Sequence, residues 1–371
     1  MASDAERAAM RRAMTLASRA LGITNPNPAV GAVVLTPGGD VAGEGVTQHA
    51  GGNHAEVEAI AAAGAAARGA TLVVTLEPCR HVGRTGPCTD AITRAGISRV
   101  VYAVDDPHEN AGGGAADLRR QGVDVESGLL ADEVRRLIEP WLVGVSRRRP
   151  YVTWKYAATL DGRTAAADGT SRWITGPAAR ADVHRERARA DAVIVGIGTV
   201  LADNPALTVR DWPSTRQPLR VVVDGAARTP ATATVLDRSA PTMVAVGDDA
   251  GEREVAALRA AGADVACLPR LGGKVDLVAL LAALYEREVR IALVEGGPTL
   301  AASFVGHDLV DRVVGYHAPA LLGGGPPVVG DLGVRSITQA CRLELDEVTR
   351  VGDDVRVVAH PRVEAAKRKD G

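Results

Sequence analysis

Short apolar runs alternate with helical patterns along the first part of the chain. The apolar runs that predict buried strands lie at 29–35, 71–78, 98–104 and 123–128. Helical patterns lie around them, at 5–20, 55–67, 88–95, near 115–121, and in a segment that runs to Trp141. Strands that alternate with helices in this way are typical of a mostly parallel sheet with helices packed on it. The first part of the chain is therefore predicted to be an α/β domain.

The same kind of pattern starts again after a polar stretch that ends in proline, SRRRP at 146–150. Strands are predicted at 151–157, 191–197, 218–225, 242–248, 290–297, 312–319 and 353–361. The last residues, EAAKRKDG, are charged and poor in apolar side chains, which is typical of a frayed terminus. We therefore expect two domains, 1–146 and 149–363, and a disordered tail at 364–371.

The composition narrows the class of protein. The chain has 371 residues, of which 46% are hydrophobic, 24% charged and only 3% aromatic, so the cores are expected to be aliphatic. A net charge of −2 gives no basic field for nucleic acid or a membrane surface. Four cysteines in a chain of this length do not look like a disulfide framework, and no signal-like or membrane-spanning apolar stretch is present. A cytoplasmic, reduced protein is expected.

A histidine and a glutamate, His54 and Glu56, stand just before an alanine-rich helical run. On a regular helix these two positions are about 200° apart, so their side chains cannot share one face. Both can point beyond the helix only from its first turn. The pair is also what an ordinary helix start contains, so its meaning depends on the residues that follow.

Two cysteines follow in the next connection from strand to helix, EPCRHVGRTGPC. Cys79 lies at the strand end and Cys88 lies where the next helix begins, and each comes directly after a proline. Proline suits a helix start, and a helix N-terminus stabilises a thiolate. With His54, the two thiolates make three ligands of a tetrahedral zinc ion and leave the fourth position to water. Zinc lowers the pKa of that water, and a carboxylate that is not a ligand, Glu56, suits the proton transfer.

Two other interpretations of the cysteines stay open, a structural zinc site and a disulfide. A structural site usually has four protein ligands, and this stretch offers only His81 as an obvious fourth. Zinc nucleobase deaminases have the signature H-x-E followed by P-C-x-x-C. This chain has the same elements, but eight residues rather than two separate its cysteines.

Glycine-bearing strand ends mark the second part of the chain. The stretch EGGPTLAASF, 295–304, follows an apolar strand and opens a helix, whose free N–H groups suit a phosphate. The stretch VGIGTVLADNP, 195–205, is only half of a dinucleotide-binding fingerprint and lacks its acidic partner. Glycine turns after strands are common, so these loops alone leave nucleotide binding undecided.

Three motifs of the first part, TNPNPAVGAVV, HAEVEAI and EPCRHVGRTGPC, occur in order within about 70 residues. Together they resemble the deaminase half of the bifunctional riboflavin-biosynthesis deaminase-reductases, although Gly86 stands where that family often has a proline. The resemblance implies a cytidine-deaminase-like α/β/α domain with His54, Cys79 and Cys88 as zinc ligands and Glu56 as the proton carrier. It places in the substrate pocket Asn25, His49, His81 and Arg84. The alternatives are a turn residue at Asn25 and a solvated loop histidine at His49.

The second part resembles the reductase domain of the same family, through RPYVTWKYAATLDGRTA, GTSRWITG, DAVIVGIGTVLADNPALTVR and VEGGPTL. The resemblance implies a dihydrofolate-reductase-like α/β domain that uses NADPH. Its cofactor contacts would be Ala157, Trp173, Thr199, Asp203, Gly225, Gly297, Pro298, Thr299, Leu300, Ala301, Ala302 and Ser303. Its substrate contacts would be Lys155, Ser171, Arg187, Leu207, Arg210 and Glu295. For the two arginines the alternative is surface charge, and a buried Lys155 needs a carboxylate partner, either Asp161 or Glu295.

The function that the resemblance implies is two consecutive steps of riboflavin synthesis. The zinc domain would deaminate 2,5-diamino-6-(5-phosphoribosylamino)pyrimidin-4(3H)-one, and the second domain would reduce the ribosyl side chain with NADPH, giving 5-amino-6-(5-phosphoribitylamino)uracil. A rival interpretation is a nucleoside or nucleic-acid deaminase fused to an unrelated nucleotide-binding domain, and another is a zinc-stabilised binding module. We expect a small-molecule substrate, no nucleic-acid or membrane partner, and a homo-oligomer, either a dimer or a tetramer.

Overall fold

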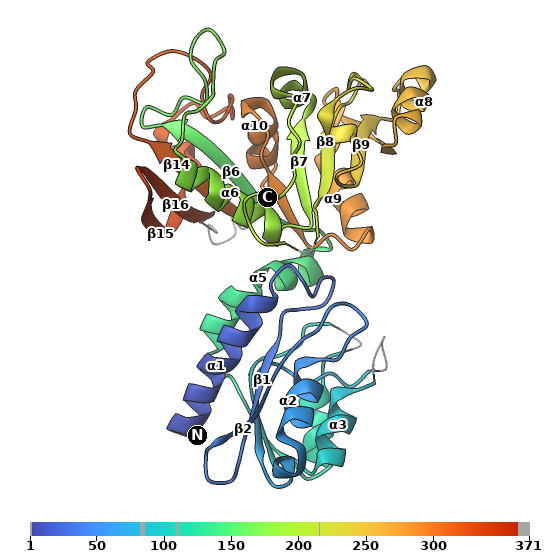
Figure 1. Cartoon of the computed structure of the whole chain (residues 1–371), viewed down its shortest axis with the longest axis vertical. Coiled ribbons are helices and arrows are strands. Elements are labelled where there is room, and N and C mark those ends of the chain that lie inside the picture. Colours follow the sequence, from blue (N-terminus) through green and yellow to red (C-terminus); the bar gives the residue numbers. More distant parts are fainter. Residues whose placement is uncertain (1, 82–85, 109–110, 215, 363–371) are drawn as a thin grey trace, which may run out of the picture. The chain divides into compact units, whose positions relative to one another are not determined.

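The computed structural model describes residues 2–81, 86–108, 111–214 and 216–362 (Figure 1). The chain divides into two compact units, Met1–Arg149 and Pro150–Gly371, each built around its own sheet. The tail predicted to be disordered, 364–371, lies outside the described residues. No helix in the described ranges is long and apolar enough to cross a membrane.

The first unit has a five-stranded sheet in the order β2-β1-β3-β4-β5. Its strands are β1 Gly31–Leu35, β2 Val41–Val46, β3 Thr71–Leu76, β4 Arg99–Val104 and β5 Asp124–Ser127. Strands β3, β4 and β5 are parallel, but β1 is antiparallel to both β2 and β3. The prediction of a mostly parallel sheet is therefore wrong for this half of it. The cause is β2, which the apolar pattern missed because glycines and a glutamate interrupt it.

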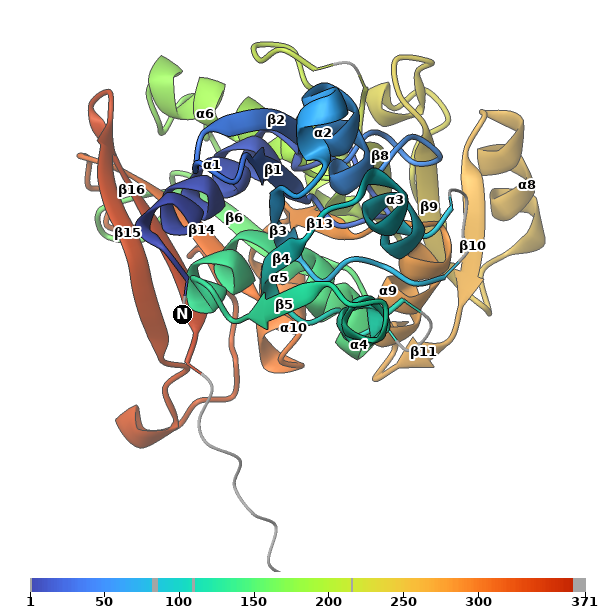
Figure 2. The ribbon, with the colours of Figure 1, turned by 90° about the horizontal axis from the view of Figure 1, so that it is seen from below.

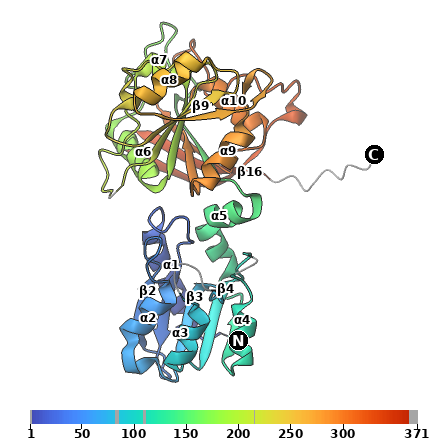
Figure 3. The same ribbon diagram turned by 90° about the vertical axis from the view of Figure 1, so that its right-hand side faces the viewer.

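Helices cover both faces of this sheet. They are α1 Asp4–Ala20, α2 Ala55–Ala63, α3 Cys88–Ala95, α4 Gly114–Arg120 and α5 Ala131–Arg147. Figure 1 shows α1 and α5 on one side of the sheet and α2 and α3 on the other, and α2 and α3 run side by side in Figure 3. A Cβ atom at Gly31 would lie 2.0 Å from the carbonyl oxygen of Ala13 in α1, and one at Gly45 would lie 2.1 Å from that of Ala55 in α2. These two glycines therefore let one helix approach each face closely.

The second unit has a nine-stranded sheet in the order β10-β9-β8-β7-β13-β6-β14-β16-β15. Its strands are β6 Tyr151–Thr159, β7 Ala192–Gly196, β8 Leu219–Val223, β9 Thr242–Gly247, β10 Asp264–Leu268, β13 Ile291–Val294, β14 Arg312–Ala318, β15 Leu343–Val351 and β16 Asp354–Pro361. All are parallel from β10 to β14, while β16 and β15 complete one edge as an antiparallel pair (Figure 2). The short strands β11 Arg270–Leu271 and β12 Lys274–Val275 form a separate hairpin. The strand β13 lies between β6 and β7, which are consecutive among the strands of this sheet along the chain.

Apolar side chains fill both faces of this second sheet. The helices are α6 Pro177–Arg189, α7 Ile197–Asp203, α8 Glu252–Ala260, α9 Leu277–Glu286 and α10 Pro298–Gly306. One core lies around Ile194, Leu280 and Phe304, and another lies around Val193 and Val222. The parallel strands inside the sheet are mostly buried on both faces and form continuous apolar runs, so the sequence pattern predicts them. The edge strand β10, which is only partly buried, was not predicted.

Candidate active sites

Three candidate metal ligands of the first unit converge at the starts of two helices. His54 is the residue directly before α2, Cys88 is the first residue of α3, and Cys79 follows β3 by three residues. The Nδ1 atom of His54 lies 3.3 Å from Sγ of Cys88 and 3.5 Å from Sγ of Cys79. All three ligand atoms lie within 4.8 Å of one another. The predicted ligands are therefore brought together.

Their chemistry and geometry fit a zinc ion. Two thiols and one imidazole are donors that zinc prefers, and both cysteines are free and buried. The disulfide interpretation is therefore not what the structure has. Within the described ranges the metal-ligand group consists of these three residues, without His81, so the four-ligand structural site is also not found. A set of three protein ligands is the arrangement of catalytic zinc sites.

The two thiols share their protons unequally. The hydrogen bond from Cys88 lowers the pKa of Cys79, and the same contact raises the pKa of Cys88. The backbone N–H of Cys88, at the start of α3, also points to Sγ of Cys79 at 3.5 Å. One thiolate is thus already stabilised by the protein, and a bound cation would favour the second as well.

Glu56 lies in the first turn of α2, where its buried carboxyl group is hydrogen-bonded with the Cys88 thiol. Burial, and then the nearby Cys79 charge, raise the pKa of Glu56 to about 7. A group that titrates near neutral pH can both take up and release a proton. The role of Glu56 as the proton carrier stays a prediction.

The residues predicted to bind the deaminase substrate have different settings. His81 follows Cys79 by two residues, and its buried Nδ1 has no hydrogen-bond partner among the described residues. Its ring stacks near that of His108, with centroids 6.5 Å apart. Asn25 is half-buried in the turn between α1 and β1, and His49 is exposed in the loop between β2 and α2. Arg84 lies outside the described residues.

Glu77 is a residue of this site that sequence reasoning missed. Its buried carboxylate accepts hydrogen bonds from the backbone N–H groups of Asp106, Gly113 and Ala115, at 2.9 to 3.2 Å. This anchors the segment that brings Ala111 against the two cysteines. The available signal was an acidic residue at the end of a buried strand, directly before Pro–Cys.

Charged side chains of the second unit meet where β13 ends beside β6. The guanidinium of Arg187, in α6, donates to both oxygens of Glu295 at 2.6 and 2.8 Å. A third donor of Arg187 reaches the carbonyl oxygen of Thr208 at 3.1 Å. Burial alone would raise the pKa of Glu295, but Arg187 outweighs it and holds that pKa at about 2. Glu295 is therefore a permanent carboxylate with a fixed orientation.

Lys155, in β6, faces this carboxylate. Burial lowers the pKa of Lys155, while the charge of Glu295 opposes that change. Asp161, the other predicted partner, instead accepts hydrogen bonds from Thr159 at 2.5 Å and from the N–H of Gly323 at 2.6 Å. The carboxylate near Lys155 is thus Glu295, whereas Asp161 binds the backbone of the loop at Gly323.

The other predicted substrate residues flank this cluster along the chain. The exposed Arg210 donates to Oγ1 of Thr208 at 3.0 Å, and its backbone N–H points to Nδ1 of His184 at 3.3 Å. Leu207 is buried with a φ of 55°, and Ser171 is half-buried. His184 is a buried neighbour that the sequence did not single out.

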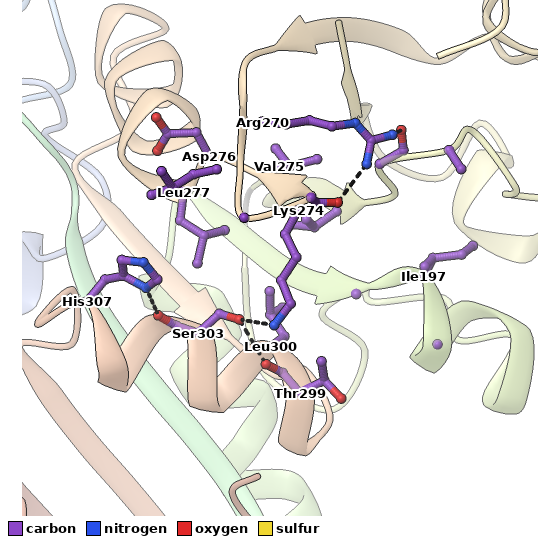
Figure 4. Close-up of a pocket in the computed structure, with 18 of the residues that line it drawn as sticks. Ile197, Arg270, Lys274, Val275, Asp276, Leu277, Thr299, Leu300, Ser303 and His307 are labelled. Carbon is purple, nitrogen blue, oxygen red and sulfur yellow. Dashed lines mark hydrogen bonds between the residues drawn. The ribbon is translucent and has the colours of Figure 1, made fainter. Parts of the chain in front are cut away.

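A cavity of about 830 Å³ opens at the carboxyl ends of β7 and β8, beside the start of α10 (Figure 4). Four of the predicted cofactor residues line it: Gly225, Thr299, Leu300 and Ser303. The remaining predicted cofactor residues are not in its lining: Ala157, Trp173, Thr199, Asp203, Gly297, Pro298, Ala301 and Ala302. Of these, Trp173 is 69% exposed, with the Arg180 guanidinium 4.5 Å from its ring centroid. Sequence reasoning missed the wall formed by the β11–β12 hairpin, which contributes Arg270 and Lys274.

Comparisons with known proteins cover both units. The family model of the cytidine and deoxycytidylate deaminase zinc-binding region matches residues 3–104, and that of the RibD C-terminal domain matches residues 150–357. The riboflavin biosynthesis protein RibD of Mycobacterium tuberculosis (strain ATCC 25618 / H37Rv) is 46% identical over 338 residues, which cover 90% of this chain and 91% of the relative. That of Escherichia coli (strain K12) is 39% identical over 361 residues, which cover 93% and 96%.

Solved structures agree over nearly the whole chain. A diaminohydroxyphosphoribosylaminopyrimidine deaminase/5-amino-6-(5-phosphoribosylamino)uracil reductase from Thermotoga maritima aligns with a TM-score of 0.86 at 36% identity, covering 96% of this chain and 99% of that one. Acinetobacter baumannii RibD aligns with a TM-score of 0.87 at 37% identity, over the same shares of the two chains.

Proposed function

Since this chain belongs to the RibD family of bifunctional riboflavin biosynthesis enzymes, we propose specific roles for the residues of its two sites. The chain is a deaminase and a reductase of riboflavin biosynthesis. The predicted folds are confirmed, a cytidine-deaminase-like first unit and a reductase unit of the dihydrofolate-reductase-like class. The proposed substrate is 2,5-diamino-6-(5-phosphoribosylamino)pyrimidin-4(3H)-one, and the proposed final product is 5-amino-6-(5-phosphoribitylamino)uracil.

The observation that carries the deaminase proposal is the convergence of His54, Cys79 and Cys88 beside a buried Glu56. Zinc held by these ligands supplies a Lewis acid that makes water a nucleophile near neutral pH. The Glu56 carboxylate takes a proton from the attacking water and passes it to the exocyclic nitrogen. The carbon–nitrogen bond then breaks and ammonia leaves. Burial raises the pKa of Glu56 above its ordinary value, which favours proton uptake by this carboxylate.

His81 is the best supported of the proposed contacts to the pyrimidine substrate. Its buried Nδ1 has no partner among the described residues, and a buried polar atom of this kind costs free energy unless a ligand or water satisfies it. We assign Asn25, His49 and Arg84 to the same pocket on the family resemblance alone.

The reductase proposal starts from the cluster around Glu295. NADPH, when bound, supplies the hydride that reduces the ring-opened ribose, because a closed glycosylamine offers no C=N or C=O to reduce. Lys155 faces the sugar as a hydrogen-bond donor, and the nearby charge of Glu295 favours its protonated form. Three N–H groups of Arg187 already donate hydrogen bonds to Glu295 and Thr208. We therefore assign Arg187 to positioning Glu295 rather than to binding phosphate. Arg210 is exposed and keeps donors for the phosphate.

The proposed cofactor site is the cavity beside α10. The cavity lined by Gly225, Thr299, Leu300 and Ser303 supports dinucleotide binding beside the start of α10, where free N–H groups suit a diphosphate. With a net charge of −2, the partners we propose are small molecules, not nucleic acid or membranes. The homo-oligomer stays a prediction, to be tested by light scattering.

One assay in two parts tests the proposed function. Purified protein with zinc is given the diaminopyrimidinone ribosyl phosphate, and ammonia release is measured first. NADPH is then added, and its oxidation is followed by absorbance. We expect ammonia release without NADPH, followed by stoichiometric NADPH oxidation. Ammonia from cytidine or from single-stranded DNA, with none from the proposed substrate, would contradict the proposal.

A further inference from the structure

The cavity at the carboxyl ends of β7 and β8 has a cationic wall that none of the predicted cofactor residues supplies. Arg270 and Lys274 come from the β11–β12 hairpin, and Arg228 comes from the loop after β8. Figure 4 shows the hairpin facing α10 across the cavity. The two cations of the hairpin, Arg270 and Lys274, differ in whether their charge is available to a ligand.

Arg270 is committed to the protein. Its Nη2 donates to the carbonyl oxygen of Gly225 at 2.7 Å, and its Nη1 donates to that of Gly273 at 2.8 Å. Its Nε pairs with the carboxylate of Asp249. These three contacts tie the hairpin to the loop after β8, so Arg270 shapes the wall rather than facing the ligand.

Lys274 is placed differently. Its side chain is exposed and reaches across to α10, where Nζ lies 3.4 Å from Oγ of Ser303 (Figure 4). No carboxylate pairs with it among the residues that the structure describes. The carboxylate that lines the same wall, Asp276, caps α9 by accepting from the N–H groups of Val278 at 2.8 Å and Ala279 at 3.3 Å. Within the described ranges Lys274 is thus a cation without a counter-ion, beside a hydroxyl group at the cavity wall.

An ammonium next to a hydroxyl group binds a phosphate monoester better than a neutral ribose, since the contact is a charge-assisted hydrogen bond. NADPH differs from NADH only by one such phosphate, on the 2′ oxygen of the adenosine ribose. We propose that Lys274, with Ser303, binds this 2′-phosphate and so sets a preference for NADPH over NADH. This inference rests on the proposed function, because it takes the cavity as the adenosine end of the cofactor site.

Equilibrium binding of two adenosine fragments to the full-length chain tests it. The probes are adenosine 2′,5′-bisphosphate and 5′-AMP, measured by isothermal titration calorimetry at fixed salt. For Lys274→Met we expect the affinity for the bisphosphate to fall about tenfold or more, as for the loss of one charge-assisted hydrogen bond, and the affinity for 5′-AMP to stay unchanged. Lys274→Arg should keep most of the bisphosphate affinity. The matched control is Arg253→Met, which removes an exposed cation of α8 outside the cavity.

Each contrary outcome has its own meaning. If the wild type prefers the bisphosphate and Lys274→Met keeps that preference, the role of Lys274 is wrong while NADPH use stands. If Lys274→Met weakens both probes equally and lowers the melting temperature, Lys274 is structural and the inference fails. If the wild type binds the two probes equally, the assignment of NADPH itself fails, and the inference fails with it.

Discussion

Glu56 and Glu295 are two buried glutamates whose surroundings drive their pKa values in opposite directions. At Glu56, burial and a neighbouring thiolate disfavour the charged form, so its pKa is about 7. At Glu295, burial also raises the pKa, but the guanidinium of Arg187, which binds both carboxylate oxygens, lowers it more and holds it at about 2. A carboxyl group that exchanges protons and one that stays charged are needed for different tasks. The nearest charged neighbour therefore decides the role of each residue.

Replacing Glu56 with glutamine should abolish deamination without disturbing the metal. The change keeps the size of the side chain but removes the group that carries the proton, and general acid–base catalysis contributes about 10²–10⁴-fold to rate. We expect ammonia release to fall by at least that factor while zinc content, measured by plasma emission spectroscopy, stays at one per chain. Ammonia release near the wild-type rate would mean that another group transfers the proton.

Replacing Glu295 with glutamine should lower stability in a manner that depends on pH. The ordinary pKa near 4.5 is depressed to about 2 in the folded protein. The stability that the ionised group contributes is therefore complete above about pH 4.5 and is lost as the pH falls toward 2. At pH 7 the variant leaves Arg187 unpaired, and we expect a cost of about 3–5 kcal/mol in the free energy of unfolding.

The measurement for Glu295→Gln is urea unfolding between pH 7 and pH 3.5, followed by the fluorescence of tryptophans such as Trp154, which is buried in the second unit. The gap between wild type and variant should be constant down to about pH 4.5 and then narrow. A gap that does not change with pH would show that the charge of Glu295 is not what stabilises the fold.

At the scale of the elements, both sites are built from the ends of strands and the starts of helices. The sequence predicts these positions for the deaminase because His54, Cys79 and Cys88 stand at visible pattern changes within a short stretch. It predicts the continuous apolar strands of the reductase for the same reason. It misses β2 and β15, because glycines or polar residues interrupt their apolar pattern, and it misses β10, whose apolar run is only four residues long.

Contacts between distant segments were beyond the sequence pattern. The ion pair of Arg187 with Glu295 joins residues 108 positions apart, and no local periodicity encodes it. The same holds for Glu77, whose partners lie 29 to 38 positions further along the chain. The family resemblance supplied the identity of site residues, but only the folded chain shows which of them bind each other.

The close contact between α2 and β2 gives an element-scale prediction. A Cβ atom at Gly45 would lie 2.1 Å from the carbonyl oxygen of Ala55, so Gly45→Ala must push α2 outward. Overpacking of this kind costs about 1–3 kcal/mol, and α2 carries Glu56 in its first turn. We expect a lower melting temperature and weaker zinc retention during dialysis. The control is Gly38→Ala, where the nearest atom would be 3.6 Å away; equal behaviour of both variants would contradict the argument.

At the scale of the whole molecule, the chain has two separate sheets with separate cores, and none of the proposed reductase residues precedes Pro150. We therefore expect that either activity can be abolished while the other is kept. A chelator should abolish ammonia release and leave NADPH oxidation intact when the deaminated intermediate is supplied. Arg210→Ala should do the reverse, weakening the reductase by about 10- to 100-fold through a lost phosphate contact.

Both rates are measured on each preparation, with circular dichroism as the control for folding. If chelation stops NADPH oxidation while the spectrum is unchanged, the two sites are not independent.

The position of β13 in its sheet has a consequence for how the protein comes into being on the ribosome. The zinc ligands all lie within the first 88 residues, and the sheet that carries them is built from strands of the first unit. The reductase sheet instead leaves its centre open until Ile291–Val294 is synthesised, because β13 must enter between β6 and β7. Pairings this distant in sequence form slowly, and a nascent chain with unpaired strand edges is prone to aggregate. We therefore expect the half made last to be the half more exposed to aggregation during synthesis.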